Sequence, residues 1–351
     1  MAKRIVIMAG GTGGHVFPAL AVAGSLIEKG WQVSWLGTQK GLESRVVPEN
    51  NIEIDWLSVA GVRGKGWSAK ITAVFMLFKA CAQARTILRQ RKPDVVLGMG
   101  GFVAGPGGLM AKLLGIPLII HEQNRVPGTT NRLLARLADQ VLEAFPDSFN
   151  KKINAKCTGN PLRKPFLNLP ETEERSISQE IRLLVVGGSQ GAQILNNVVP
   201  EAVAELKDIH IKHQTGAAML EQVTERYKAL GVHADVNAFI DDMVAAYQWA
   251  DIVICRSGAM TVSEVAAVGK PAIFIPLPGA IDDHQTANAR YLTDSGAGTM
   301  LLQKDLNSAS LVEHIITVLE QLESIGKKAK QCARLDATEA VAACCIAEAK
   351  A

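Results

Sequence analysis

Short apolar runs alternate with longer amphipathic segments along the chain. The run Arg4–Met8 is rich in β-branched residues, ends at glycines and is followed by a helical pattern from Pro18 to Lys29. Continuous apolar runs are typical of strands buried on both faces of a parallel sheet, and their alternation with helices is typical of α/β domains. The first half of the chain therefore predicts a parallel sheet covered by helices. Its further predicted strands are Val33–Leu36, Asp94–Leu97 and Pro117–His121, with a helix at about Gly107–Leu114.

The second half of the chain repeats this order. Ile181–Val186 runs into a glycine-rich loop at 187–191, as the first strand runs into the loop at 10–14. A later strand–helix–strand unit around Asp251–Cys255 matches the unit around Asp94–Leu97. This repeated order predicts an α/β fold class with two Rossmann-like parallel-sheet domains that face each other across a cleft.

A proline-rich and then polar stretch between Thr158 and Glu180 is the predicted linker, because few contacts need to cross such a segment. We predict an N-terminal domain at 1–160, a C-terminal domain at 161–335 and a final helix within 336–351 that packs back on the first domain. In open parallel sheets, ligands bind beyond the carboxyl ends of the strands. The chemistry is therefore expected in the glycine-rich loops that follow the strands.

Composition narrows the class of protein. With 48% apolar and 20% charged residues, the 351-residue chain has the make-up of a globular protein, and its net charge of +3 gives no whole-chain signal for nucleic acid. No apolar run approaches the roughly 20 residues that span a bilayer. Six scattered cysteines without a C-x-x-C pair favour reduced thiols and a cytoplasmic protein.

The first glycine loop, Gly10–Gly14, follows a strand and opens a helix. Glycines admit a close approach of the backbone and a helix N-terminus attracts phosphate, although a tight strand-to-helix turn would use the same residues. Val16 stands where the dinucleotide fingerprint needs a small residue, which disfavours NAD, and the absence of a Walker sequence excludes a P-loop. His15 is either a neutral general base or a residue that only hydrogen-bonds a phosphate or the backbone.

The loop from Cys255 to Glu264 also leads from a strand into a helix. Its first backbone N–H groups would point at a diphosphate, and Ser189 in the second glycine loop could donate to a phosphate oxygen. Glu264 could accept hydrogen bonds from both hydroxyls of a ribose, although an acid near a helix N-terminus is also an ordinary stabilising choice. Gln285 can offer a donor and an acceptor to sugar hydroxyls.

No Asp-x-Asp occurs anywhere in the sequence. The usual carboxylate pair for a catalytic Mg²⁺ or Mn²⁺ is missing, so we expect no metal and no other cofactor. Helix N-termini, backbone N–H groups and Arg163 or Arg256 would then neutralise a leaving diphosphate. Two further stretches follow predicted strands: Gly98–Gly108 is suited to a close backbone approach, and the polar run His121–Asn124 favours the lining of a cleft over a core.

The segment Trp67–Arg91 is predicted to be a helix in which Ile71, Phe75 and Phe78 recur at helical spacing among basic residues. Such a stripe is typical of a helix that lies on a membrane surface, and equally of a helix that faces a core. The first interpretation gives an anionic membrane surface as a partner, without a segment that spans the bilayer.

Together these motifs resemble the MurG family of glycosyltransferases, over essentially the whole chain and in the same order. The motifs are Gly10–His15, Gly98–Gly108, His121–Asn124, Thr158–Arg163, Gly187–Ala192, Arg256–Glu264 and Gln285–Asn288. The resemblance implies a GT-B fold and the inverting transfer of N-acetylglucosamine from UDP-N-acetylglucosamine to undecaprenyl-diphosphate-linked muramoyl-pentapeptide, which converts lipid I into lipid II. It further implies a role in peptidoglycan synthesis, cell shape and cell division, and a peripheral location on the cytoplasmic face of the inner membrane.

The resemblance also assigns residues to roles. The backbone at Ile240 would read uracil, Glu264 would bind the ribose, and His15 and Glu122 are the candidates for proton abstraction. The remaining candidates for contact with the donor or for the lining of the cleft are Thr12, Gly13, Gly14, Asn124, Arg163, Ser189, Ala259, Met260, Thr261, Val262, Ser263 and Gln285.

Two positions depart from some relatives of this family. Phe102 stands where some carry Tyr, so no phenol can act there, and His284 stands where some carry Gln, which leaves its role open. Two other activities would fit the same architecture. A UDP-N-acetylglucosamine 2-epimerase would need neither an acceptor nor a lipid-facing surface, and a non-catalytic nucleotide-sugar sensor would bind the donor without turnover. The glycine loops alone do not separate these activities from a transferase.

Overall fold

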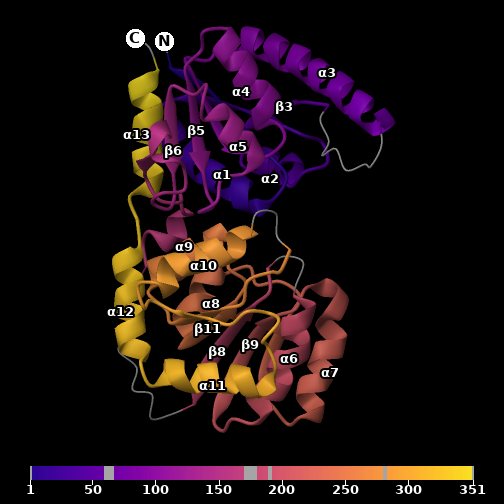
Figure 1. The fold of residues 1–351 in the computed structure, drawn as a ribbon, viewed down its shortest axis with the longest axis vertical. Helices are drawn as coiled ribbons and strands as arrows, with labels where there is room; N and C mark the ends of the chain where they lie inside the picture. Colours follow the sequence, from indigo (N-terminus) through magenta and orange to yellow (C-terminus); the bar gives the residue numbers. More distant parts are fainter. Residues whose placement is uncertain (1, 59–66, 170–179, 189–191, 280–282, 350–351) are drawn as a thin grey trace. The chain divides into compact units, whose positions relative to one another are not determined.

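The structure is a computed structural model that describes residues 2–58, 67–169, 180–188, 192–279 and 283–349, with the backbone alone for 67–73. The chain divides into two compact units (Figure 1): unit 1 comprises Met1–Arg163 and Arg334–Ala351, and unit 2 comprises Lys164–Ala333. The predicted boundaries at 160/161 and 335/336 lie within three residues of these divisions. The cleft between the domains stays a prediction.

Unit 1 is built on a sheet of seven described strands, all parallel, in the order β3-β2-β1-β4-β5-β6-β7. The central strands are mostly apolar because helices cover both faces of the sheet. In β1, Ile5 and Ile7 pack into the core on one face, whereas Val6 and Met8 pack into the core on the other. The strands are β1 (Arg4–Ala9), β2 (Gln32–Gly37), β3 (Glu53–Trp56), β4 (Val95–Gly100), β5 (Leu118–Glu122), β6 (Gln140–Glu143) and β7 (Lys156–Cys157).

The helices of unit 1 include the last helix of the chain, which packs against the first (Figure 1). Glu339 in this last helix accepts hydrogen bonds from Ser25 Oγ at 2.7 Å and from Lys29 Nζ at 2.8 Å. The sequence therefore returns to unit 1 after unit 2 is complete. The helices are α1 (Gly13–Glu28), α2 (Glu43–Glu49), α3 (Trp67–Arg91), α4 (Ala104–Leu113), α5 (Thr129–Leu134), the 3-10 turn η1 (Lys151–Ile153) and α13 (Ala337–Glu348).

Two helix starts were predicted too late. Helix α1 begins at Gly13, five residues before the predicted Pro18, and α4 begins at Ala104 instead of Gly107. Glycine has a low intrinsic helix propensity, so the sequence pattern assigned these first turns to loops. In both cases packing against the sheet overrides the propensity.

Unit 2 repeats the plan with six described parallel strands in the order β10-β9-β8-β11-β12-β13. In each unit the strand order reverses beside the first strand, and ligands of such sheets bind where the order reverses. The predicted class of two parallel-sheet α/β domains is confirmed. The strands are β8 (Ile181–Val186), β9 (Ile209–Gln214), β10 (Ala234–Asn237), β11 (Ile252–Cys255), β12 (Ala272–Phe274) and β13 (Thr299–Met300).

Helices again cover both faces of this second sheet. The buried core on one face combines residues of β8 and β9 with residues of the helices at Gln193–Ala204 and Ser308–Leu319. No helix within the described residues combines the length and the apolar character that crossing a bilayer requires. The helices of unit 2 are η2 (Lys164–Phe166), α6 (Gln193–Ala204), η3 (Ala217–Met219), α7 (Leu220–Ala229), α8 (Met243–Trp249), α9 (Ala259–Val268), α10 (His284–Thr293), α11 (Ser308–Leu319) and α12 (Leu322–Cys332).

Candidate active site

The glycine loop after β1 presents an uncapped helix N-terminus. Gly11 has a φ of +96°, and Thr12 takes the N-cap position of α1 in an extended conformation, without a capping hydrogen bond from its side chain. Gly11 and Thr12 are exposed, and Gly13 and Gly14 are half-buried. The first turn of α1 therefore offers backbone N–H groups and the positive end of the helix dipole to an anion.

Glu43, at the start of α2, holds this loop in place through hydrogen bonds. The carboxylate is fully buried and accepts hydrogen bonds from Gly11 N at 2.9 Å, Thr38 N at 2.9 Å and Thr38 Oγ1 at 2.7 Å. A Cβ at Gly10 would lie 2.7 Å from its Oε1, so the glycine leaves room for the acid. Sequence analysis missed Glu43, whose one signal is an acid in the first turn of a helix.

The glycine-dense loop after β4 packs directly on the first loop. Gly101 has a φ of +81°, and a Cβ there would lie 2.4 Å from the carbonyl oxygen of Gly10. Gly100 has a φ of +101°, and a Cβ there would lie 2.9 Å from the ring of His15. The close backbone approach predicted for this loop is thus an approach to the first glycine loop and to His15.

His15 is half-buried and belongs to a chain of hydrogen bonds inside unit 1. Its Nδ1 lies 2.7 Å from Gln123 Oε1, and Gln123 Nε2 lies 3.0 Å from His121 Nδ1. His121 Nε2 lies 2.9 Å from the carbonyl oxygen of Gly159. Burial lowers the pKa of His121 to about 4, so its ring is neutral near pH 7.

The carboxylate of Glu122 is buried and surrounded by donors. Oε1 accepts from Asn124 N at 2.9 Å and from Asn124 Nδ2 at 3.2 Å, and Oε2 accepts from Gly128 N at 3.1 Å and Asn131 Nδ2 at 2.9 Å. These bonds order the loop after β5. They use the oxygen lone pairs that a general base would need.

Three of the four polar residues at the carboxyl end of β5 differ from the sequence expectation. His121, Glu122 and Gln123 were expected to line a cleft, but each is at most 1% exposed and is hydrogen-bonded within unit 1. Asn124 alone is half-buried. Burying polar groups is unfavourable unless they are hydrogen-bonded, and these three side chains have hydrogen-bond partners inside unit 1.

Arg163, the last residue of the first segment of unit 1, is half-buried. Its guanidinium carbon lies 5.6 Å from the centroid of the Phe17 ring, within the range of a cation–π contact. Phe17 belongs to the second turn of α1, so the contact holds a cation beside the helix that follows the first glycine loop.

In unit 2, the loop after β8 is joined to the loop after β10 by Gln214, a buried residue that sequence analysis missed. Gln214 Nε2 donates to Gly188 O at 2.9 Å, and Gln214 Oε1 accepts from Ile240 N at 3.0 Å. The backbone N–H of Ile240 is therefore already hydrogen-bonded to Gln214. The carbonyl oxygen of Ile240 is the backbone group that could accept from a nucleobase. Ser189 lies outside the described residues.

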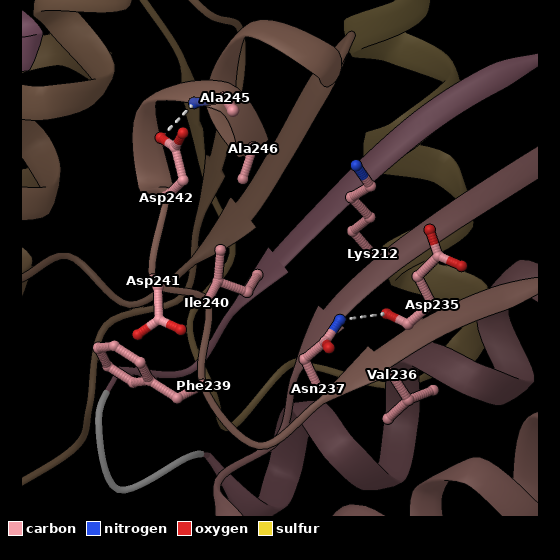
Figure 2. A pocket seen from close by; sticks show the side chains of 10 residues that line it. All are labelled: Lys212, Asp235, Val236, Asn237, Phe239, Ile240, Asp241, Asp242, Ala245 and Ala246. Carbon is pink, nitrogen blue, oxygen red and sulfur yellow. Dashed lines mark hydrogen bonds between the residues drawn. The ribbon is translucent and has the colours of Figure 1, made fainter.

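A cavity of about 610 Å³ lies beside Ile240 (Figure 2). Its walls come from β9, β10, the loop after β10 and α8. Carboxylates of Asp235, Asp241 and Asp242 line it, with Lys212 as the basic group, so a diphosphate would meet mostly like charge here. The remaining lining residues are Val236, Asn237, Phe239, Ala245 and Ala246.

The N-terminus of α9 follows β11. Gly258 occupies the N-cap in an extended conformation, and no N-cap side chain caps the first turn at Ala259, Met260 and Thr261. Val262 is buried, and Ser263 Oγ donates to Ala259 O at 3.0 Å, which uses that hydroxyl within the helix.

Arg256 does not fit the expected neutralising role. Its Nη1 donates to Ile275 O at 3.0 Å and to Pro276 O at 3.1 Å, and its Nη2 donates to Gln303 Oε1 at 2.8 Å. Burial lowers the pKa of this guanidinium. The side chain ties β11 to the end of β12 instead of facing a ligand.

Glu264 and Gln285 are the residues predicted to contact the ribose and the sugar hydroxyls. Glu264 is half-buried in the second turn of α9, where its Oε2 accepts from Tyr247 Oη at 3.3 Å. Gln285, at the start of α10, accepts from Leu277 N at 2.9 Å through Oε1, which directs its amide nitrogen to other acceptors.

Within the described residues, one group of three side chains has the composition of a metal site: Glu180, His210 and His233. It lies at the amino ends of β8, β9 and β10, the opposite end from the glycine loops. Its candidate ligand atoms lie within 4.8 Å of one another, and His210 Nδ1 lies 3.7 Å from Glu180 Oε2. We assign no metal to this group.

The long helix α3 exposes large apolar side chains. Phe75 and Phe78 are 72% and 71% exposed, whereas Ala80, Ala84 and Leu88 are buried on the opposite side. The two phenylalanines therefore do not face a core. The side chain of Ile71 lies outside the described residues.

The chain is similar to named proteins over its full length. Family models of glycosyltransferase family 28 match residues 5–143 (N-terminal domain) and residues 182–343 (C-terminal domain). A Methylococcus capsulatus protein named UDP-N-acetylglucosamine–N-acetylmuramyl-(pentapeptide) pyrophosphoryl-undecaprenol N-acetylglucosamine transferase is 56% identical over 356 residues, covering 100% of both chains. The crystal structure of MurG from Acinetobacter baumannii matches with a TM-score of 0.85 at 41% identity, over 98% of this chain and 99% of that one. The chain belongs to the MurG family.

Membership of the MurG family makes the chain a glycosyltransferase of family 28, which confirms the resemblance found in the sequence. A UDP-GlcNAc 2-epimerase from Neisseria meningitidis also matches, with a TM-score of 0.65 over 97% of this chain and 98% of that one. Its sequence identity is 14%, so this likeness shows the shared fold alone. The epimerase alternative is therefore the weaker one.

Proposed function

We propose that this chain transfers N-acetylglucosamine from UDP-N-acetylglucosamine to the muramyl-pentapeptide carried by pyrophosphoryl-undecaprenol, with inversion at the anomeric carbon. The observation that carries the proposal is the 56% identity, over the full length of both chains, with a relative that bears this transferase name. The product is lipid II, and through it the enzyme would serve peptidoglycan synthesis, cell shape and cell division.

Unit 2 is the proposed donor-binding unit. The helix N-terminus at Ala259–Ser263 suits the diphosphate of the donor, because it combines N–H groups with a positive dipole and follows a glycine N-cap. Glu264 would accept hydrogen bonds from the ribose, and the carbonyl of Ile240 would meet the uracil ring. Ser189 and the amide of Gln285 would complete the contacts to phosphate and sugar.

Unit 1 is the proposed acceptor unit, with His15 as the general base. His15 keeps one ring nitrogen, Nε2, without a hydrogen-bond partner among the described residues, whereas both carboxylate oxygens of Glu122 are saturated. A neutral imidazole with a free lone pair can take the proton of the acceptor hydroxyl. Glu122 would order the loop that carries Asn124.

The first glycine loop, also in unit 1, is proposed to bind an anion. Thr12, Gly13 and Gly14 open α1 without a capping side chain, and the cation of Arg163 lies beside Phe17 in the next turn. Backbone N–H groups and one arginine can bind the acceptor diphosphate or stabilise the developing charge of the leaving diphosphate.

The proposed mechanism uses no metal ion and no other cofactor. The sequence lacks an Asp-x-Asp pair, so no carboxylate pair is available in the pattern that usually holds a divalent cation on a nucleotide-sugar diphosphate. The N-termini of α1 and α9 would supply the positive potential instead.

We also propose that α3 rests on an anionic membrane surface from the cytoplasmic side. The exposed phenylalanines Phe75 and Phe78, with Ile71 one turn earlier in sequence, supply apolar contact, and Lys79, Arg85 and Arg89 are exposed on the same helix. An apolar stripe flanked by basic residues is typical of a helix that lies in the headgroup region. A lipid-linked acceptor makes such a location necessary.

The test is release of UDP from UDP-N-acetylglucosamine in the presence of EDTA, with and without a short-chain analogue of the lipid-linked muramyl-pentapeptide. Release that depends on the acceptor supports both the transferase and the metal-free mechanism. Release that requires added Mg²⁺ would keep the transferase and overturn the metal-free mechanism. Donor binding with no release in either condition would overturn the transferase in favour of the epimerase or the sensor.

A further inference from the structure

We propose that Gln123 and His121 set the tautomer of His15, so that its neutral ring carries the proton on Nδ1 and presents Nε2 as the proton acceptor. Gln123 acts in this proposal as a positioning residue, because it touches the base and not the reacting atoms. The catalytic consequence rests on the proposed function, in which His15 is the base. The tautomer itself is a property of unit 1 that can be observed without substrate.

The argument begins at the carbonyl oxygen of Gly159, which can only accept hydrogen bonds. His121 Nε2 lies 2.9 Å from it and must therefore be the protonated nitrogen. The acceptor is held firmly: Gly159 has a φ of +85°, and a Cβ there would lie 2.6 Å from Arg334. Because burial keeps His121 neutral, its Nδ1 carries no proton and is an acceptor.

The amide of Gln123 is oriented by two acceptors. Its Nε2 lies 3.0 Å from the acceptor Nδ1 of His121 and 3.1 Å from the carbonyl oxygen of the same residue. The reversed amide would set Oε1 against both of these lone pairs, which rules out that orientation. Oε1 of Gln123 therefore faces His15.

At 2.7 Å from Oε1 of Gln123, the Nδ1 of His15 must be a donor. The ring lies close against Gly100, where an added Cβ would be 2.9 Å from its Nδ1 and Cε1. In the neutral ring the lone pair is then on Nε2, which has no partner among the described residues. In the alternative tautomer, the lone pair of Nδ1 would lie against the lone pairs of Gln123 Oε1, which is repulsive.

This arrangement has a direct consequence for the transfer step. The acceptor hydroxyl oxygen bonds to the anomeric carbon of the donor as the bond from that carbon to the diphosphate oxygen breaks, and the diphosphate leaves with the electron pair. The hydroxyl proton passes to Nε2 of His15. The resulting imidazolium keeps its Nδ1–H bond to Gln123, whose carbonyl dipole stabilises the new positive charge.

The tautomer can be read from ¹⁵N NMR spectra of the full chain with labelled histidine, with the His15 signals assigned by their loss in His15→Ala. We expect a protonated Nδ1 and an unprotonated Nε2 in the neutral ring. Gln123→Met keeps the size of the side chain but removes both links, and it should release His15 to the Nε2–H form. The kcat should fall by roughly 10²-fold, the lower end of what a positioned base contributes, with KM for UDP-N-acetylglucosamine within twofold.

Gln123→Glu separates tautomer control from mere packing. A carboxylate can still accept from Nδ1 of His15 but cannot donate to His121, so this variant should keep the Nδ1–H form and more of the activity than Gln123→Met. An Nε2–H form in the unsubstituted chain would overturn the proposal, as would a Gln123→Met variant with unchanged tautomer and kcat. The expected tautomers together with full transfer by His15→Ala would support the tautomer control while overturning the base assigned in the proposed function.

Discussion

The buried carboxylate of Glu43 accepts a 2.9 Å hydrogen bond from the backbone N–H of Gly11, a residue 32 positions earlier in the chain. The same carboxylate accepts two hydrogen bonds from Thr38, so one acid holds together the loops that follow β1 and β2. The conformation of the first glycine loop depends on this acid, although no atom of Glu43 is exposed to a substrate.

Glu43→Gln should therefore destabilise unit 1 and slow the transfer. The amide nitrogen would face a backbone N–H, which leaves a buried donor unpaired and weakens a charge-assisted contact, a loss of about 1.5–3 kcal/mol. Urea unfolding followed by tryptophan fluorescence measures the first effect, and kcat measures the second. Glu49→Gln, on the exposed side of the same short helix, is the matched control and should change neither. Equal effects of the two substitutions would remove the role given to Glu43.

The ribose contact proposed for Glu264 has a kinetic signature. Glu264→Ala removes a charged hydrogen-bond partner, which typically amounts to about 1.5–3 kcal/mol, so the KM for the donor should rise by roughly ten- to a hundredfold. Initial rates over a range of UDP-N-acetylglucosamine concentrations provide the measurement. Glu221→Gln, an exposed acid in α7, serves as the control, and a change in KM of less than twofold in Glu264→Ala would exclude the ribose contact.

Much of the fold could be predicted because its strands carry a local signal. The β-branched runs at Arg4–Met8 and Ile181–Val186 indicated the first strand of each unit, and both lie centrally in their sheets. The starts of α1 and α4 were wrong because glycines there are read as loop residues, whereas sheet packing makes them helical.

The supporting residues of the site could not be predicted from local patterns. Glu43 and Gln214 bond backbone groups that lie 32 and 26 positions away, and a single sequence does not record which backbone atoms meet. Arg256 was one of the two arginines expected to neutralise the diphosphate, but its guanidinium donates to carbonyl oxygens at the end of β12. The glycine-rich loops could thus be predicted from the sequence, whereas the residues that hold them in place could be identified only in the structure.

Burial of His121 predicts a loss of stability in acid. Its pKa is about 4 in the folded chain, against an ordinary value of 6.5. Between these two values the unfolded chain binds one more proton than the folded chain, so stability falls as the pH is lowered from about 6.5 to 4. This group contributes at most about 1.4 kcal/mol per pH unit and has no effect above that window. Urea unfolding at several pH values should show a smaller slope for His121→Gln, and identical slopes would contradict the prediction.

The exposed face of α3 predicts binding to anionic vesicles. Burial of one phenylalanine side chain in the headgroup region is worth about 1.5–3 kcal/mol, so Phe75→Glu should weaken binding by roughly ten- to a hundredfold. Sedimentation with vesicles of phosphatidylglycerol and phosphatidylcholine gives the partition coefficient. Binding should also weaken at high salt, because Lys79, Arg85 and Arg89 contribute through a screened attraction.

The matched control for this surface is Ile316→Glu, which places the same charge on an exposed apolar position of α11 in unit 2. This control should bind vesicles as the unsubstituted chain does, and both variants should turn over a water-soluble acceptor analogue at the original rate. A loss of vesicle binding confined to Phe75→Glu assigns the lipid contact to α3, because the two variants share the charge change and differ only in where it lies. Unchanged binding of Phe75→Glu, or an equal loss in both variants, would contradict the proposal that α3 contacts the membrane surface.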